Sequence, residues 1–405
     1  MTKPLHFGIL REEKMPPDRR APLSPPQAAF AVRNFPVQLL VQPSGHRCFS
    51  DEEYRRLGLS LTEELDPCQV LLGLKEVPEE LLIPGKTYCM FSHTIKKQPY
   101  NRDLLRAILK KKIRLIDYEA ITDDRGRRVI AFGRFAGMVG AHNALYTYGR
   151  RTGLFSLPRL FDCHDYAEAV SIYRQLDLPP VRIVLTGTGR VGAGAAQVLR
   201  DMGIRQINPS DYLSRSFDEP IFTQLRTRDY VVRRDGAPFT AEDYHREPGE
   251  FTSVFAPFYR SSDIMINGIY WDSRAPAFFS REEMRHPDYR ISVIADVTCD
   301  IAPVSSIPAT LRPTTIEDPV FGYDPESGTE TEPHREGCID MMTIDNLPSE
   351  LPRDASESFG KQFIQHVLSE FLKADSDMLK RATVATDGQL GPHFGYLRDY
   401  VEGKE

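Results

Sequence analysis

Long apolar runs are missing from this sequence. No stretch approaches the ~18–20 consecutive apolar residues that a membrane span requires. The first residues, MTKPLHFGILREEK, lack the apolar core of a signal peptide and are typical of a short strand. We therefore expect no membrane partner and no secretion, and we predict a cytoplasmic protein.

Closely spaced cysteines are missing as well. The six cysteines stand far apart and form no CxxC pair, so we interpret them as reduced thiols of a cytosolic protein. No cysteine and histidine have the spacing of metal ligands, since Cys163 and His164 are directly adjacent. The sequence therefore predicts no metal site.

An excess of positive charge is also missing. The chain has 51 Lys and Arg against 57 Asp and Glu, which gives a net charge of −6. Its most basic run, residues 110–112, is typical of a solvated helix end before a strand. We therefore expect no nucleic-acid partner, because phosphate-backbone binding needs a basic face.

Alternating strand-like and helix-like segments fill the first third of the chain. At ~100–200 residues per domain, 405 residues indicate two or three domains. Strand-like runs cover residues 5–12, 37–44, 70–77, 87–93 and 113–121. Helix-like segments lie between them at residues 24–35, 50–58 and 100–112. Strands separated by helices predict a parallel sheet that is covered on both faces.

A second α/β unit begins at Val181. Before it, residues 134–152 form a helix-like segment in which Gly137 and Gly140 would let another backbone approach closely. Residues 303–338 are rich in Pro, Thr and Glu, and we expect a long irregular excursion there. Residues 352–373 have one apolar helical face and are expected to pack back onto the first domain.

A glycine-rich turn is the strongest chemical motif. It directly follows the apolar strand of residues 183–185 and leads into a helix, which is the context of a dinucleotide fingerprint. The first glycine would make the tight turn, the second would let the pyrophosphate approach, and the third would let the helix sit close to the strand. The predicted cofactor-binding residues of this turn are Gly187, Thr188, Gly189, Arg190, Val191 and Gly192.

The choice between NAD and NADP depends on the next strand. A carboxylate ~20 residues after the glycine turn would accept a hydrogen bond from the ribose of NAD. No carboxylate stands there, because the strand ends at Asn208 and Asp211 follows three residues later. This absence favours NADP slightly, while NAD remains open because Asn208 or Asp211 could serve the ribose.

Several motifs in a particular order resemble one enzyme family along nearly the whole chain. They are DRRAPLSP, GLKEVP, MFSHTIKKQ, RLIDYEAITDDRGRRVIAFGRFAGMVG, LTGTGRVGAGA, MINGIYW and MTIDNLPSELPRDASESFG. With them the chain resembles the lysine-forming saccharopine dehydrogenases. It is most similar to the lysine–ketoglutarate reductase half of the bifunctional lysine-degrading enzyme, and more distantly to alanine dehydrogenase and the NAD-binding part of transhydrogenase.

This resemblance implies an α/β fold of two Rossmann-like domains with parallel sheets. A catalytic, substrate-binding domain like the N-terminal domain of alanine dehydrogenase would comprise residues 1–139 and 341–405. The NAD(P)-binding Rossmann domain, residues 140–340, would be inserted into it. The active site is expected in the cleft between the domains, at the ends of the strands.

The resemblance also implies an oxidoreductase that acts on a CH–NH bond. Lysine and 2-oxoglutarate would join through an imine, which hydride from the nicotinamide reduces to saccharopine. Lys75 and His93 end predicted strands and match the acid–base pair of the family. Histidine titrates near neutral pH, and a lysine can do so where burial or nearby cations lower its pKa.

Substrate-binding residues are carried over in the same way. The matching cations, which would grip carboxylates, are Arg20, Lys96 and Arg128, with Lys14 a weaker match. The matching acids near the amine are Glu76 and Glu119, and Asp345 matches an aspartate near the nicotinamide.

Alternative functions remain open for this sequence. The chain could be another alanine- or opine-type dehydrogenase on the same fold, or a cofactor-binding pseudoenzyme. The joint presence of Lys75, His93, Arg128 and Asp345 argues against the pseudoenzyme. The direction of the reaction and the formation of a homo-oligomer are also open.

Overall fold

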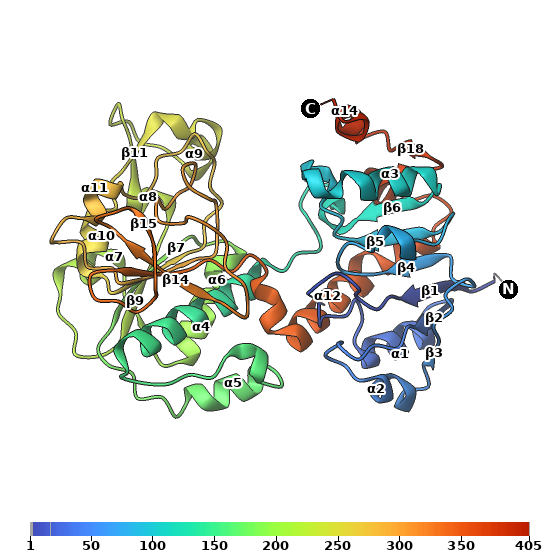
Figure 1. Cartoon of the computed structure of the whole chain (residues 1–405), viewed down its shortest axis with the longest axis horizontal. Helices are drawn as coiled ribbons and strands as arrows, with labels where there is room; N and C mark the ends of the chain where they lie inside the picture. The colour runs from blue at the N-terminus through green and yellow to red at the C-terminus, as the bar shows by residue number, and fades with distance from the viewer. Residues whose placement is uncertain (1–2, 17, 405) are drawn as a thin grey trace. The chain divides into compact units, whose positions relative to one another are not determined.

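The computed structural model describes residues 3–16 and 18–404. In it the chain divides into two compact units (Figure 1): unit 1 holds the residues up to Ala131 and those from Pro352 on, and unit 2 is Phe132–Leu351. The expected boundaries, at 139/140 and 340/341, instead lie inside helix α4 (Gly133–Thr152) and strand β16 (Ile339–Met342), both of unit 2. Among the described residues, no helix combines the length and the apolar character that crossing a membrane would take.

Unit 1 is built on an eight-stranded sheet of order β18-β17-β6-β5-β4-β1-β2-β3. The strands are β1 (Leu5–Ile9), β2 (Val37–Val41), β3 (Ser60–Leu61), β4 (Val70–Leu72), β5 (Thr87–Met90), β6 (Arg114–Asp117), β17 (Thr383–Thr386) and β18 (Gln389–Leu390). Strands β1 to β6 pair in parallel, and the two strands of the return segment pair antiparallel at one edge. The predicted parallel sheet is confirmed.

Helices cover this sheet, and the return segment supplies three of them. The helices of unit 1 are α1 (Pro25–Asn34), α2 (Asp51–Arg56), α3 (Arg102–Lys110), α12 (Pro352–His366), α13 (Asp377–Ala382) and α14 (Arg398–Glu402). The ring of Phe359 on α12 lies 4.9 Å from that of Tyr118, and the ring of Phe371 lies 5.5 Å from that of Phe7. The late apolar helix therefore packs on the first part of the chain, as its periodicity predicts.

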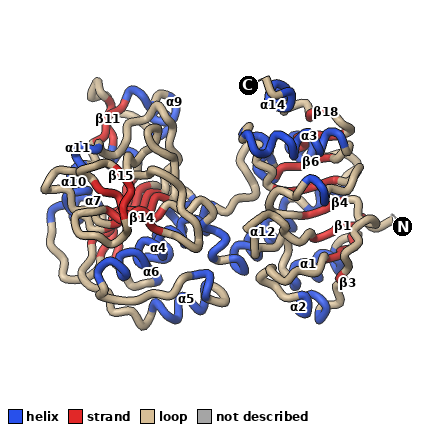
Figure 2. Tube along the Cα trace, in the orientation of Figure 1, coloured by secondary structure: helices blue, strands red, loops and turns tan. Residues whose placement is uncertain are grey.

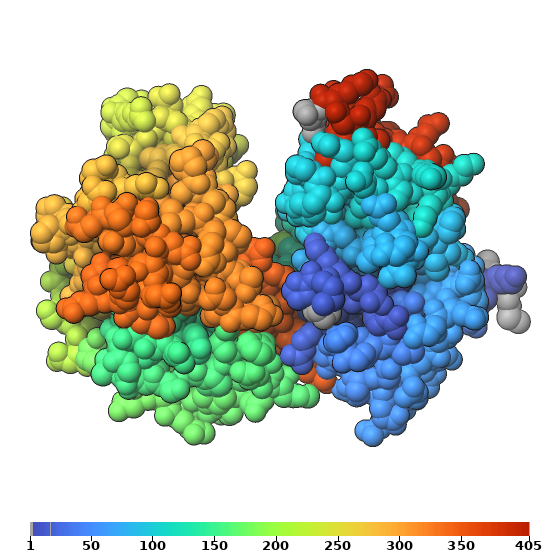
Figure 3. Space-filling view, viewed as in Figure 1, coloured from blue at the N-terminus to red at the C-terminus, as the bar shows by residue number. Residues whose placement is uncertain are grey.

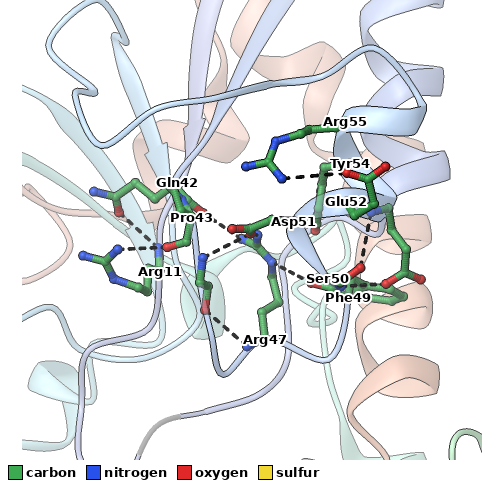
Figure 4. Close-up of polar contacts among 12 residues, drawn as sticks. Arg11, Gln42, Pro43, Arg47, Phe49, Ser50, Asp51, Glu52, Tyr54 and Arg55 are labelled. Atoms are coloured by element: carbon green, nitrogen blue, oxygen red, sulfur yellow. Dashed lines mark hydrogen bonds and ion pairs between the residues drawn. The ribbon is translucent and has the colours of Figure 1, made fainter.

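The loop between β2 and α2 is held by a buried arginine (Figure 4). The guanidinium of Arg47 donates to the carbonyls of Gln42 and Phe49, and Nη2 lies 2.8 Å from Oδ1 of Asp51. Helix α2 then begins with a capping box, in which Ser50 accepts from the backbone of Glu53 and Glu53 accepts from the backbone of Ser50.

Unit 2 is built on a second eight-stranded sheet, of order β15-β14-β16-β13-β12-β7-β9-β8 (Figure 2). Its further strands are β7 (Arg182–Thr186), β8 (Arg205–Gln206), β9 (Ile221–Leu225), β12 (Ile264–Asn267), β13 (Val293–Asp296), β14 (Val320–Asp324) and β15 (Thr329–Thr331). Strands β10 (Val231–Arg233) and β11 (Phe251–Ser253) form a separate antiparallel pair. The α/β class with two mostly parallel sheets is thus confirmed.

The segment 303–338 is irregular over most of its length, as its composition predicts, but two strands interrupt it. It contains β14 and β15, which pair antiparallel and extend the sheet beside β16. The residues of β14 are mostly buried, so apolar burial overrides the Pro- and Glu-rich flanks. Figure 3 shows the orange surface of this part of the chain on one face of unit 2.

Small residues let two helices of unit 2 pack backbone to backbone. These two are α4 and α6 (Arg190–Asp201). The other helices of unit 2 are α5 (Tyr166–Tyr173), α7 (Pro209–Ser214), α8 (Thr227–Tyr230), α9 (Ala241–Arg246), α10 (Ala256–Ser261) and α11 (Arg281–Met284). A Cβ on Gly137 of α4 would overlap the carbonyl of Val191, and one on Gly194 of α6 would overlap that of Arg134. The close approach predicted for Gly137 is confirmed, whereas Gly140 adjoins a side chain, that of Val297.

Candidate functional site

The glycine-rich turn of unit 2 joins β7 to α6. Gly187 has φ +93°, and a Cβ there would meet the carbonyl of Gly268. A Cβ on Gly192 would overlap the carbonyl oxygen of Gly187, so the helix can approach the strand only without a side chain. A Cβ on Gly189 would meet nothing within 4 Å. The turn thus leaves open space above Gly189 at the start of a twelve-residue helix, and it fits a pyrophosphate.

The other predicted residues of the turn divide into two kinds. Thr188 and Arg190 are exposed, so both can face a ligand. Val191 is half-buried: its carbonyl lies against Gly137, and its side chain lies against Gly268. Val191 therefore has a packing role in the turn and exposes no side-chain group to a ligand.

Gln224 also holds the turn and was missed by sequence reasoning. It lies on neighbouring β9, and its Nε2 donates to the carbonyl of Gly187 over 2.9 Å.

Asn208 acts as a helix cap in this structure. Its Oδ1 accepts from the backbone N–H of Asp211 over 2.9 Å, and its Nδ2 donates to the Asp211 carboxylate over 2.8 Å. It follows β8 at the sheet edge, and β9 stands between β8 and the glycine-turn strand β7. The end of β9, rather than Asn208, is therefore the neighbour of the glycine turn.

A buried polar network holds the carboxyl ends of β7, β12 and β13 together. Thr186 Oγ1 donates to Asn267 Oδ1 over 2.7 Å, and Asn267 Nδ2 donates to Asp296 Oδ1 over 2.9 Å. Thr310 Oγ1 donates to the second oxygen of Asp296 over 2.6 Å. Burial raises the pKa of Asp296. The network fixes the strand ends beside the glycine turn.

Asp345 lies beyond β16, the strand next to β13. Its carboxylate is exposed and lies near the thiol of Cys299. Burial raises the pKa of that thiol to about 12, and the charges of Asp296 and Asp345 add to the rise. The structure thus places Asp345 at the carboxyl edge of the unit 2 sheet.

Lys75 and His93 follow neighbouring strands of the unit 1 sheet. Lys75 comes three residues after β4, and His93 comes three residues after β5, which pairs with β4 in parallel. His93 has φ +51°, a left-handed conformation that is uncommon for a residue other than glycine. Such local strain is concentrated at functional sites. The carboxyl edge of this sheet therefore carries both predicted catalytic side chains.

Glu76 orients the imidazole of His93. The distance between His93 Nδ1 and Glu76 Oε1 is 2.6 Å. Because a carboxylate only accepts, Nδ1 carries the hydrogen, and in the neutral ring Nε2 is left as the acceptor. Asn101 Nδ2 donates to the same carboxylate oxygen over 3.2 Å, and Lys14 Nζ donates to Oε2 over 2.8 Å. The structure thus brings Glu76, His93 and the weaker candidate Lys14 together.

These contacts keep Glu76 ionised. Burial alone would raise its pKa, but the hydrogen bonds from His93 and Lys14 prevail and lower the pKa to about 2. A cavity of ≈ 360 Å³ adjoins this carboxylate. Its lining includes Lys14, Glu76, Tyr100, Asn101 and Leu104.

Replacing Glu76 by Gln should remove a pH-dependent part of the stability. The wild-type carboxyl has a pKa near 2 when folded and near 4.5 when unfolded. It therefore stabilises the fold above about pH 4.5, and this contribution is lost as the pH falls toward 2. A shift of this size corresponds to about 3 kcal/mol. The stability difference between wild type and Glu76→Gln should shrink by about that amount from pH 6 to pH 2.5 in urea titrations. Glu80→Gln, which alters an exposed carboxylate nearby, is the control, and an equal difference at both pH values would contradict the expectation.

Lys75 lies among opposing charges. Burial lowers the pKa of its ammonium, and the nearby Arg20 lowers it further, while Asp18 and Glu76 act in the opposite direction. A lysine with a lowered pKa can exchange a proton closer to neutral pH than a solvated one can. The predicted acid–base character of Lys75 thus has a physical cause in this structure.

Glu12 holds the segment that carries Lys75, and sequence reasoning missed it. Its two carboxylate oxygens accept from the backbone N–H groups of Leu74 and Lys75, over 2.6 and 2.9 Å. The side chain is buried, and burial raises its pKa to about 8. Glu12 follows β1, which pairs with β4, so the strand order brings together residues that lie far apart in the sequence.

Replacing Glu12 by Ala should destabilise unit 1 by about 3 kcal/mol. The change leaves two N–H groups without an acceptor, and each unsatisfied buried donor costs about 1–3 kcal/mol. Urea unfolding followed by circular dichroism measures the effect. Glu13→Ala is the control, because Glu13 is exposed and pairs only with Arg11 among the described residues. Equal stability of the two variants would show that Glu12 does not hold this segment.

Arg20 forms a buried two-point ion pair with Asp18. Its Nε lies 2.9 Å from Oδ1 and its Nη2 lies 2.6 Å from Oδ2 of that carboxylate. The pair lowers the pKa of Asp18 well below its ordinary value, although burial acts the other way. This edge of the Arg20 guanidinium is therefore bound by Asp18, and the charge of Arg20 lowers the pKa of Lys75.

Lys96, Glu119 and Arg128 come together in a second cluster of unit 1. Lys96 Nζ and Arg128 Nη1 each lie 3.1 Å from Glu119 Oε1. The other oxygen, Oε2, is buried and accepts no hydrogen bond from the residues described. A buried carboxylate oxygen without a donor is costly, and a cationic ligand would satisfy it. Three of the predicted substrate-binding residues thus form one charged site.

Asp117 links this cluster to His93. At the end of β6 its Oδ2 accepts from the backbone and the hydroxyl of Ser92, over 3.0 and 2.6 Å. Its Oδ1 accepts from the backbone of Glu119 over 2.8 Å. Asp117 is buried and was missed by sequence reasoning, although its place at the end of a strand was a usable signal.

Over residues 3–16 and 18–404, no group of three His, Cys, Asp or Glu side chains is arranged to hold a metal ion.

The chain is similar in sequence to a known domain family and to several known enzymes. The model of the alanine dehydrogenase/PNT N-terminal domain matches residues 8–139. The mouse mitochondrial alpha-aminoadipic semialdehyde synthase is 30% identical over 98% of this chain and 48% of its own length. The chain thus spans about half the length of that relative. Saccharopine dehydrogenase [NAD(+), L-lysine-forming] of Emericella nidulans is 28% identical over 89% of this chain and 90% of its own length.

Solved structures resemble the chain in fold. An L-alanine dehydrogenase matches with a TM-score of 0.66 at 15% identity, over 99% of both chains. A transhydrogenase from Sinorhizobium meliloti matches with a TM-score of 0.57 at 15% identity, over 95% of this chain and 98% of that one.

Proposed function

We propose that this chain is a nicotinamide-dependent oxidoreductase acting on a CH–NH bond. Its similarity to alpha-aminoadipic semialdehyde synthases and saccharopine dehydrogenases supports this, as does the match of residues 8–139 to the alanine dehydrogenase/PNT N-terminal domain. Its substrates are lysine and 2-oxoglutarate, and its product is saccharopine, in the manner of a lysine–ketoglutarate reductase. NADP is the favoured dinucleotide. The observation that carries the proposal is the 2.6 Å bond between Glu76 and His93, beside a lysine of lowered pKa.

Formation of the imine needs two proton transfers with the protein. The ammonium of lysine must first lose a proton, and its nitrogen then attacks the keto carbon. A proton of that nitrogen passes to the keto oxygen, and the resulting hydroxyl must gain one from the protein to leave as water. Lys75, whose pKa is lowered, accepts the first proton. His93 supplies the second from Nε2, the ring nitrogen that does not contact Glu76. The nicotinamide supplies hydride to the imine when it is bound at the glycine turn.

Charged side chains of unit 1 select the two substrates. Arg128 and Lys96 present donors that suit a carboxylate of the keto acid. Glu119 Oε2, which has no donor among the described residues, suits the ammonium of the amino acid. Glu119 therefore balances the two cations in the free protein and faces an amine in the complex. The six free thiols support placing this reaction in the cytoplasm.

An absorbance assay of NADPH and NADH tests the proposal. Oxidation should require both lysine and 2-oxoglutarate, and saccharopine with the oxidised dinucleotide should run the reaction backward. Oxidation with pyruvate or another amine, but not with lysine, would replace the proposal by another alanine- or opine-type dehydrogenase. Nucleotide binding without any turnover would indicate a pseudoenzyme.

A further inference from the structure

The strand beside the glycine turn is the third strand of unit 2 in sequence rather than the second. Strand β9 pairs with β7 in parallel, with Thr186 opposite Leu225. The backbone N–H of Gly187 donates to the Leu225 carbonyl over 3.0 Å, and Gln224 Nε2 donates to the Gly187 carbonyl over 2.9 Å. These bonds set the end of β9 level with the glycine turn.

The residue after this strand occupies the position at which dinucleotide-binding folds distinguish NAD from NADP. In dinucleotide-binding folds, an acid at the end of the strand next to the glycine turn binds the ribose 2′-hydroxyl of NAD, and an arginine nearby accommodates the 2′-phosphate of NADP. Here that residue is Arg226, followed by Thr227 and Arg228. The second strand in sequence, β8, lies beyond β9 and cannot supply the group.

Arg226 is available for an anion. Both Arg226 and Arg228 are exposed, and among the described residues no carboxylate forms an ion pair with either guanidinium. The nearest acid in sequence, Asp229, accepts from the backbone N–H of Arg226 over 2.7 Å, which holds the main chain at the end of β9. An exposed cation on a fixed backbone, with no acid in the strand-end position, favours phosphate over a bare hydroxyl.

We propose that Arg226, assisted by Arg228, binds the 2′-phosphate of NADP(H) and makes this chain selective for the phosphorylated dinucleotide. The inference rests on the proposed function only in requiring a dinucleotide at the glycine turn. It reassigns the discriminating position from Asn208, which caps α7, to the end of β9. The preference for NADP then follows from a cation that is present, rather than from a carboxylate that is missing.

Equilibrium binding to the full chain, without amine or keto acid, tests this assignment. NADPH and NADH are titrated by their fluorescence against wild type, Arg226→Ala and Arg226→Lys. Loss of a charge-assisted bond of about 1.5–3 kcal/mol should weaken NADPH binding about 10–100-fold in Arg226→Ala. NADH binding should change less than about threefold, since no 2′-phosphate is involved, and Arg226→Lys should restore part of the NADPH affinity. Adenosine 2′,5′-bisphosphate should displace NADPH from wild type far better than AMP does, and Arg226→Ala should abolish this advantage.

Arg215→Ala is the matched control, because Arg215 is an exposed arginine of unit 2 beyond the edge strand β8. It should bind both dinucleotides as wild type does. Equal NADPH affinities in wild type and Arg226→Ala, tighter binding of NADH than of NADPH by wild type, or no binding of either would overturn the inference. NADPH selectivity that depends on Arg226, without turnover of lysine and 2-oxoglutarate, would refute the proposed substrates alone.

Discussion

Replacing Lys75 by Met or His93 by Gln is expected to lower kcat of the lysine- and 2-oxoglutarate-dependent reaction about 10²–10⁴-fold, the range of general acid–base catalysis. Neither variant should change NADPH or NADH binding, because both side chains belong to unit 1 and the glycine turn belongs to unit 2. The loss should fall on kcat more than on KM, since both groups act on protons that move during the reaction. Steady-state kinetics with either dinucleotide measures it.

The pH profile distinguishes a catalytic lysine from a merely structural one. Burial and the charge of Arg20 lower the pKa of Lys75 below its ordinary value of 10.5. As the proton acceptor in the reductive direction, Lys75 should make activity rise as the pH rises through this lowered pKa, and Lys75→Met should lack that rise. Lys110→Met and His46→Gln, which alter exposed residues of unit 1, are the matched controls. Wild-type turnover in Lys75→Met or His93→Gln would remove these residues from the mechanism.

Local sequence signals predicted most elements of the fold because each has a short-range cause. A capping box of Ser50 and Glu53 begins the helix predicted within residues 50–58, and Gly192 leaves room for the carbonyl of Gly187 as predicted. The order of strands has no such local cause. Nothing in the sequence near Asn208 indicates that β9 inserts between β8 and β7. Sequence reasoning therefore considered Asn208 for the ribose, whereas we propose the end of β9.

The candidate site shows the same division. Lys75 and His93 were identified by motif and by their places at strand ends, and the structure sets them after paired strands. Glu12 and Asp117 were missed because their partners lie 62 or 63 and 25 residues away along the chain. Only the pairing of β1 with β4 and of β5 with β6 brings these acids to the segments that they hold. Residues that position a site are thus harder to read from sequence than residues that perform its chemistry.

Replacing Gly192 by Ala is expected to weaken nucleotide binding and to destabilise unit 2. The added Cβ would overlap the carbonyl oxygen of Gly187, and a backbone atom cannot rotate away as a side chain can. Either α6 or the turn must shift, at an overpacking cost of about 1–3 kcal/mol. Where this free-energy cost falls on the conformation of the turn that binds nucleotide, the dissociation constants of NADPH and NADH rise about 5–150-fold. Both should rise together, because the pyrophosphate is common to the two dinucleotides.

Gly189→Ala separates the two effects of Gly192→Ala. A Cβ at Gly189 meets no atom within 4 Å, so the free protein should keep its melting temperature. The same Cβ would occupy the open space where the pyrophosphate approaches, so nucleotide affinity should still fall. Gly249→Ala, whose Cβ would make only an ordinary contact at 3.6 Å, is the control for both measurements. Wild-type affinity in Gly189→Ala and Gly192→Ala would mean that the nucleotide binds elsewhere, because a phosphate cannot share that space with a methyl group.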